Sequence, residues 1–327
     1  MPKEPIYDPR FQTENIAFDE EKMIACGKCS RSNPPNRLKC MYCGGGLKIA
    51  DASVVRANLR RLEIWERGYN VILRSRSEND VDLVQIAAFL AIESEQLSAI
   101  LDLAQPLPIA RVESEKEAAI AVEKLECLGL KCSVLSDEAL AVEKPPVRLS
   151  GMVIDERTLM LRHFNTSSLT ETSTDELVLI VPGTINLSRV DSTAKKGFRS
   201  EAKLTGESAT ATDEAILDIY LRSDSNGFRI RLSGFDFSCL GEEKGLLAVE
   251  NMQRLIAVLR ERAPNAKFVN SYVAVRQALS RVWDVESRKE SHGVQHSGFG
   301  KAELNTVDST SNLNQFTKYS RLQRHLL

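Results

Sequence analysis

The sequence predicts a multidomain α+β protein made of a small zinc finger, a βααβαβ sandwich and a β-rich domain capped by a helix. Three observations predict this class. Two CxxC pairs lie near the N-terminus, helical periods alternate with short strand-like runs in the middle, and several strand-like runs precede a long amphipathic stretch. With 327 residues, 43% of them apolar, the chain is long enough for two or three domains.

The first domain, residues 23–50, is built around four cysteines in two CxxC pairs that are separated by ten residues. They are Cys26, Cys29, Cys40 and Cys43. Four thiolates fill the shell of tetrahedral zinc, so we expect one structural Zn²⁺ with no position for water or substrate. Gly27 and Gly44 are expected to supply the positive φ that turns amide N–H groups toward the sulfurs. A redox pair is the alternative, but no thioredoxin-like strand and helix surround the motif.

The spacing CGKC, Asn33, CMYC resembles the Ran-binding-protein type of zinc finger, with Ile24 in place of the family's tryptophan before the first cysteine. This resemblance implies binding of RNA or ubiquitin. For RNA, the contacts would be hydrogen bonds and base stacking on single-stranded segments. The residues that would make them are Arg31, Asn33, Arg37 and Tyr42. The alternative interpretation is that these are solvated residues on a small zinc ribbon.

Two segments flank the finger. Residues 1–22 are polar and lack a sustained period, which predicts a flexible lead-in. Residues 53–67 place Val55, Leu59, Leu62 and Trp65 at helical intervals. This spacing predicts a connecting helix with a basic outer face.

The next domain, residues 69–140, has the predicted order βααβαβ. The expected elements are a strand at 69–74, helices at 81–91 and 94–104, a strand at 109–112, and a third helix and strand. Ser94 is expected to cap the second helix, and Ser114 with Glu117 forms a capping box for the third.

The segments YNVILRS, LSAILDLAQPLP and ESEKEAAIAVEKLECLGLKCSVL resemble the C-terminal domain of the bacterial ribosomal stalk protein. The resemblance implies helices packed on a small sheet, and protein binding rather than catalysis. Glu93 and Glu95 stand where that family carries a lysine-bearing motif. Docking on translation factors is therefore not expected.

The C-terminal half begins after a stiff linker at residues 141–147, which contains Pro145 and Pro146. Residues 148–284 are expected to form a β-rich domain with C-terminal helices, loosely similar to a pleckstrin-homology domain in element order. Its expected strands are at 149–154, 158–164, 176–185, 215–222 and 228–237. Residues 285–327 are expected to be a flexible tail, because 287–311 are rich in Ser, Asn, Gly and Thr.

No segment predicts an enzyme or a small-molecule substrate. His292 and His296 have helical metal spacing, but glycine argues against a helix there, and the glutamate of a zinc protease is missing. A basic loop with Lys195, Lys196 and Arg199 is expected to be solvated.

The remaining indications concern location and partners. The formal net charge of −2, the lack of a membrane span and an N-terminus unlike a secretory signal predict a cytoplasmic protein. We therefore interpret the chain as a non-enzymatic modular binding protein, an adaptor or scaffold for another protein. The alternative is an RNA-binding or translation-associated protein that uses the zinc finger.

Overall fold

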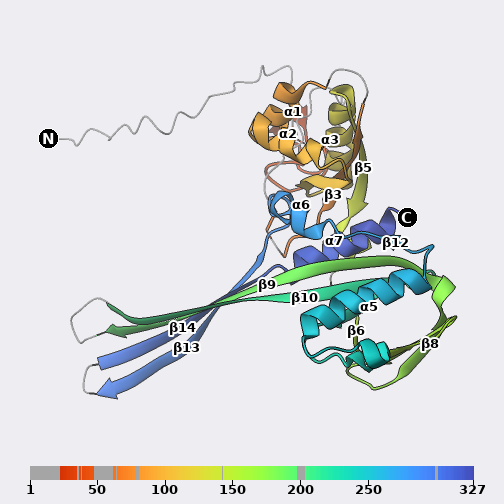
Figure 1. Cartoon of the computed structure of the whole chain (residues 1–327). Coiled ribbons are helices and arrows are strands. Elements are labelled where there is room, and N and C mark those ends of the chain that lie inside the picture. Colours follow the sequence, from red (N-terminus) through yellow and green to blue (C-terminus); the bar gives the residue numbers. More distant parts are fainter. Residues whose placement is uncertain are drawn as a thin grey trace.

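The computed structural model describes residues 23–34, 37, 39–47, 62–63, 65–77, 81–141, 143–196, 203–298 and 301–327. Within these ranges, only the backbone is described for 194–196, 203–205, 292–298 and 301–305. The predicted lead-in, residues 1–22, lies outside the described residues, as does most of the predicted helix at 53–67. The described chain combines helices and sheets, which confirms the predicted α+β class (Figure 1).

The middle unit has the predicted order βααβαβ. Its elements are β3 (Tyr69–Arg76), α1 (Leu83–Leu90), α2 (Ser94–Asp102), β4 (Leu107–Val112), α3 (Glu115–Cys127) and β5 (Leu130–Ser136). β3 lies between β4 and β5 and is antiparallel to both. The predicted capping box of α3 is present, because Ser114 Oγ accepts the N–H of Glu117 at 3.3 Å and Ser114 N–H donates to Glu117 Oε2 at 3.2 Å. The predicted cap of α2 was wrong: Glu93 is the N-cap and Ser94 is already helical, since the side chain of Gln96 reaches back to the Glu93 N–H.

The C-terminal half is built on a nine-stranded sheet that curls into a half-barrel (Figure 1). Its strands are β6 (Val147–Ile154), β7 (Thr158–His163), β8 (Leu169–Ser173), β9 (Leu177–Lys196), β10 (Lys203–Leu221), β11 (Phe228–Arg231), β12 (Lys267–Phe268), β13 (Glu286–Gly298) and β14 (Lys301–Ser311). The order is β13-β14-β9-β10-β11-β6-β7-β8, and β12 pairs with β9. The expected strand at 228–237 ends early at Arg231, because the chain turns at residues 232–234 before the 3₁₀ segment η4 (Phe237–Glu243) begins.

β9 and β10 separate two apolar cores. Along β10, Leu217, Ile219 and Leu221 point into the curl of the sheet, where α5 (Ala248–Arg262) packs. The alternate residues Ile216 and Tyr220 point to the opposite face, toward α6 (Tyr272–Leu279) and α7 (Leu313–His325). This alternation follows from the period of two in a strand, and here both faces are buried.

The expected flexible tail at residues 285–327 was wrong. β13 and β14 form an antiparallel hairpin, and β14 pairs with β9 from Ser311 opposite Leu187 to Ala302 opposite Lys196. Together with the outer parts of β9 and β10 they make a four-stranded arm that projects from the body (Figure 1). A polar sequence forms this arm because its backbone groups pair with β9, which requires little apolar burial.

The expected linker at 141–147 does not divide the chain into separate cores. One continuous apolar core contains residues of β3, α2 and α3 together with residues of β9, α6 and α7. Trp283, fully buried just after α6, donates its indole N–H to Asn70 Oδ1 of β3 at 2.8 Å. Arg321 of α7 donates to the carbonyls of Leu140 and Ala141, at the end of α4 (Asp137–Leu140), and to the carbonyl of Lys144. The C-terminal helix therefore ties the linker and the middle unit to the large sheet.

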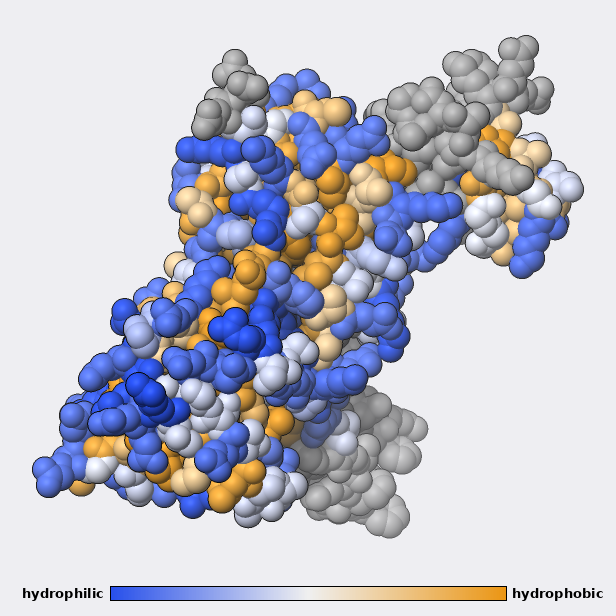
Figure 2. Space-filling view, turned by 90° about the vertical axis from the view of Figure 1, so that its right-hand side faces the viewer, coloured by the Kyte–Doolittle hydropathy of each residue, from blue (hydrophilic) through white to orange (hydrophobic). Residues whose placement is uncertain are grey.

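The surface mixes hydrophobic and hydrophilic residues. On the face shown in Figure 2, hydrophobic residues lie in groups among charged and polar side chains. Within the described ranges, no single helix is long and apolar enough to cross a membrane.

Candidate metal centre

Two backbone turns of the same design hold the four cysteines. In the first turn, the N–H of Cys26 donates to the carbonyl of Arg31 at 3.0 Å, and the N–H of Ser30 donates to the carbonyl of Cys26 at 2.7 Å. The second turn repeats this pattern from Cys40 to Gly45 at 2.8 Å and from Gly44 to Cys40 at 3.0 Å. Because the two turns are equivalent, each presents two sulfurs in the same way.

The positive φ that each turn requires falls on the residue after its second cysteine. Gly44 takes φ +67° in the second turn, as predicted. In the first turn this position is Ser30, with φ +57°, and the predicted role of Gly27 was wrong. The spacing explains the difference, because Gly27 lies between the two cysteines whereas Gly44 follows them.

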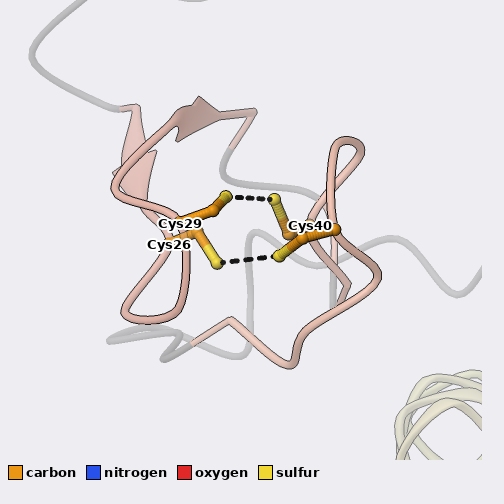
Figure 3. Close-up of side chains that lie close together, drawn as sticks. Cys26, Cys29 and Cys40 are labelled. Carbon is orange, nitrogen blue, oxygen red and sulfur yellow. Dashed lines mark hydrogen bonds between the residues drawn. The ribbon is translucent and has the colours of Figure 1, made fainter.

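The four sulfurs meet between the two turns. Cys26 Sγ lies 3.6 Å from Cys43 Sγ, and Cys29 Sγ lies 3.5 Å from Cys40 Sγ (Figure 3). All four Sγ atoms lie within 4.8 Å of one another. Two thiolates on a tetrahedral zinc with bonds of about 2.3 Å lie roughly 3.8 Å apart. The arrangement is therefore compatible with one metal ion bound by all four predicted ligands.

Backbone N–H groups point at the sulfur of the first cysteine in each pair. Lys28 N–H lies 3.4 Å from Cys26 Sγ and lowers the pKa of that thiol. For Cys40, burial raises the pKa, but hydrogen bonds led by the N–H of Tyr42 at 3.4 Å outweigh it and lower the pKa to about 6. Such donors stabilise thiolates, which is the form that binds metal.

Asn33 is part of the scaffold of this centre and is not a surface contact. Its side chain is fully buried; Nδ2 donates to the carbonyl of Arg31 at 2.7 Å, and Oδ1 accepts the N–H of Met41 at 2.8 Å. The amide thus joins the first turn to the second. β2 (Ser32–Asn33), paired with β1 (Ile24–Ala25), places it there. The prediction that Asn33 contacts nucleic acid was therefore wrong, since both ends of the amide are used internally.

The other three predicted contact residues are exposed. The guanidinium of Arg31 lies 4.8 Å from the centre of the Tyr42 ring, and Arg37 is also exposed. The sequence reasoning missed Met41, whose side chain is 53% exposed beside Tyr42 at 55%. Its position between two cysteines was the available signal, because residues inside a tight ligand turn have little room to pack inward.

The other candidate residues do not join this site. His292 and His296 lie in β13 and not on a helix, and their side chains are outside the described part of the chain. Lys195 and Lys196 end β9, and Arg199 lies outside the described residues. No family model, curated protein or solved structure matches the chain.

Proposed function

We propose that the four cysteines bind one structural Zn²⁺. In support, the two equivalent turns bring four sulfurs within 4.8 Å of one another, which is compatible with one tetrahedral ion, and a segment this small has few apolar residues to fold around. Only Cys26, Cys40 and Leu47 are buried apolar residues in the described part of the finger. The ion therefore supplies the folding energy of the finger and takes no part in a reaction.

The protein as a whole is proposed to be a non-enzymatic adaptor whose finger binds another protein in the cytoplasm. The observation that carries this proposal is the exposed pair Met41 and Tyr42, which project from the second metal-binding turn. Methionine and tyrosine give a large contact area, and a metal-bound turn holds them in place before binding. Less conformational entropy is then lost when a partner binds.

The alternative is single-stranded RNA binding by the same surface. Two observations favour it: the guanidinium of Arg31 lies over the Tyr42 ring, and Arg37 is a second exposed cation. Arginine and an aromatic ring together are suited to stacking and to phosphate contacts. We favour protein binding because Asn33, the fourth residue predicted to contact RNA, is buried, and because Met41 adds exposed apolar area.

Capture experiments with the full-length tagged protein separate the two functions. We compare wild type with Met41→Ala, Arg31→Ala and Tyr42→Ala, with and without nuclease, and identify bound molecules by mass spectrometry and RNA sequencing. Leu169→Ala is the matched control, because Leu169 is 63% exposed on β8, away from the finger.

Protein binding predicts partners that resist nuclease, disappear with Met41→Ala and Tyr42→Ala, and remain with Leu169→Ala. RNA binding predicts capture that nuclease abolishes and Arg31→Ala weakens. If every captured molecule is retained by all three finger variants, neither function belongs to this surface. Metal content of the purified protein, measured independently, tests the zinc proposal.

A further inference from the structure

A cavity of about 510 Å³ lies at the junction of the middle unit and the C-terminal half. One part of its wall precedes β3, a second comes from α4 and the residues after it, and a third comes from α7 and the residues around the start of β13. This volume is within the range of small-molecule sites, which commonly lie where structural units meet.

One ion pair on the wall is already complete. Arg111 donates from Nε and Nη2 to Asp137 Oδ2 at 2.9 and 2.6 Å. The Asp137 carboxylate also accepts the N–H of Gly68 at 2.8 Å and the amide of Asn70 at 2.9 Å. Both charged side chains are nearly buried, at 8% and 14% exposure. This ion pair is therefore structural, and we do not expect either side chain to bind a ligand.

Lys318 differs from its neighbours because its ammonium forms no ion pair with any described residue. It lines the cavity from α7, one turn beyond Asn314, and is half-buried. Among the residues that the structure describes, its ammonium makes no hydrogen bond and no ion pair within 4.0 Å; its nearest aromatic contact is the Trp283 ring at 5.9 Å. Burial lowers the pKa of this amine to about 8, so most of it is charged at neutral pH. The Asp137 carboxylate acts on this amine but is already paired with Arg111. A partly desolvated cation with no carboxylate at ion-pair distance gains strongly from an incoming anion.

The exposed rim of the cavity carries negative charge, in contrast to the cationic Lys318. Glu138 and Glu143 are 79% and 80% exposed and share Arg67, at 3.2 and 3.3 Å, in ion pairs that solvent weakens. Trp65 stands beside them with 79% of its side chain exposed. Carboxylates next to an indole face suit a cation, and a quaternary or primary ammonium best.

We propose that this cavity binds a small zwitterion of the amino-acid or betaine class, with its carboxylate on Lys318 and its ammonium against Trp65 and the rim carboxylates. A single unpaired amine matches one negative charge. The acidic residues of the lining, including Glu286, would repel a doubly charged phosphate. The proposed site is independent of the finger, so it stands or falls separately from the adaptor function.

The experiment is isothermal titration of the full-length protein with glycine betaine and with L-alanine. Acetate, which lacks the cation, and tetramethylammonium, which lacks the carboxylate, serve as half-ligands. Lys318→Met keeps the side-chain length but removes the charge. Lys289→Met is the matched control, because Lys289 is 72% exposed on β13 and pairs with Asp308.

We expect at least one zwitterion to bind more tightly than either half-ligand, and Lys318→Met to weaken it at least tenfold while Lys289→Met does not. A second readout uses only the wild type: the cation of betaine does not titrate, so its affinity should fall as pH rises through 8. The charges that act on the amine are those of Asp137 and Arg111, and Asp284 and Glu286 line the same cavity. Absence of binding by both zwitterions overturns the proposal. So does betaine binding by the wild type that is unchanged between neutral and alkaline pH.

Discussion

Replacing Phe316 by alanine tests whether the middle unit and the large sheet share one core. Phe316 is fully buried on α7; its ring packs edge-on against Tyr272, with ring centres 4.9 Å apart. It also fills the space above Gly183, where an added Cβ would lie 2.3 Å from a ring carbon. Removing a phenylalanine from such a site costs about 3 to 5 kcal/mol. That is a large share of a typical unfolding free energy of about 5 to 15 kcal/mol.

Hydrogen exchange read by mass spectrometry is the assay. If the core is continuous, protection from exchange should decrease in β3 and α3 as well as in β9 and β10, because all of them unfold together. A loss of about 4 kcal/mol should raise the exchange of their slowest amides by roughly a thousandfold, since each 1.4 kcal/mol is a factor of ten. Phe164→Ala is the control, because that ring is 40% exposed and lies outside the shared core.

The opposite result would refute this reasoning. If Phe316→Ala weakens the sheet while residues 69–136 keep their protection, the two parts unfold independently. The linker at 141–147 would then be a true domain boundary, as the sequence suggested.

Three further predictions concern single side chains. Cys40→Ser should release the metal and unfold the finger, while exchange protection in the shared core stays at the wild-type level; a loss of protection in the core would contradict this. Asn33→Ala should speed zinc transfer to a chelator about 10- to 100-fold, because the amide that joins the two turns is lost; an unchanged rate would remove Asn33 from the scaffold. For Glu214, burial raises the pKa, but hydrogen bonds from Arg231 and Ser233 outweigh it and lower the pKa below its ordinary value. Its contribution to stability is therefore present above the unfolded pKa of about 4.3 and lost as the pH falls through the folded value. Glu214→Gln should destabilise the protein at pH 7 in urea titrations, and the difference from wild type should close on acidification.

The parts of the fold that the sequence predicted well are those set by local chemistry. Metal ligation needs close pairs of cysteines, so the finger is visible in the spacing of Cys26, Cys29, Cys40 and Cys43 alone. The capping box at Ser114 and Glu117 is likewise contained in four consecutive residues. Asn33 shows the limit of this reasoning. An asparagine at this position can face solvent or join the two turns, and which it does depends on Met41, eight residues away.

The C-terminal segment was misread because its stability comes from distant partners. Residues 301–311 have little apolar area of their own, yet β14 pairs along ten positions of β9, more than a hundred residues earlier in the chain. The composition of a segment indicates how much apolar area it can bury alone. It does not indicate whether the backbone can form hydrogen bonds with a strand elsewhere in the chain.

The helix α7 is also stabilised by distant partners, in this case through its side chains. Several of its polar residues are buried, which a hydrophobicity pattern reads as unfavourable, but Gln315, Thr317, Ser320 and Arg321 each have a matching group elsewhere in the chain. Thr317 accepts from Arg229 at 2.9 Å, within reach of the buried pair that Arg229 forms with Asp218 at 2.7 Å. Ser320 lies 2.8 Å from the hydroxyl of Tyr220. Buried polar groups contribute to stability only when they are paired, so the same sequence is unfavourable alone and stabilising when docked. The end of this chain is therefore ordered by complementarity to the sheet, and a substitution in the sheet at Asp218 should loosen α7 as surely as one in α7 itself.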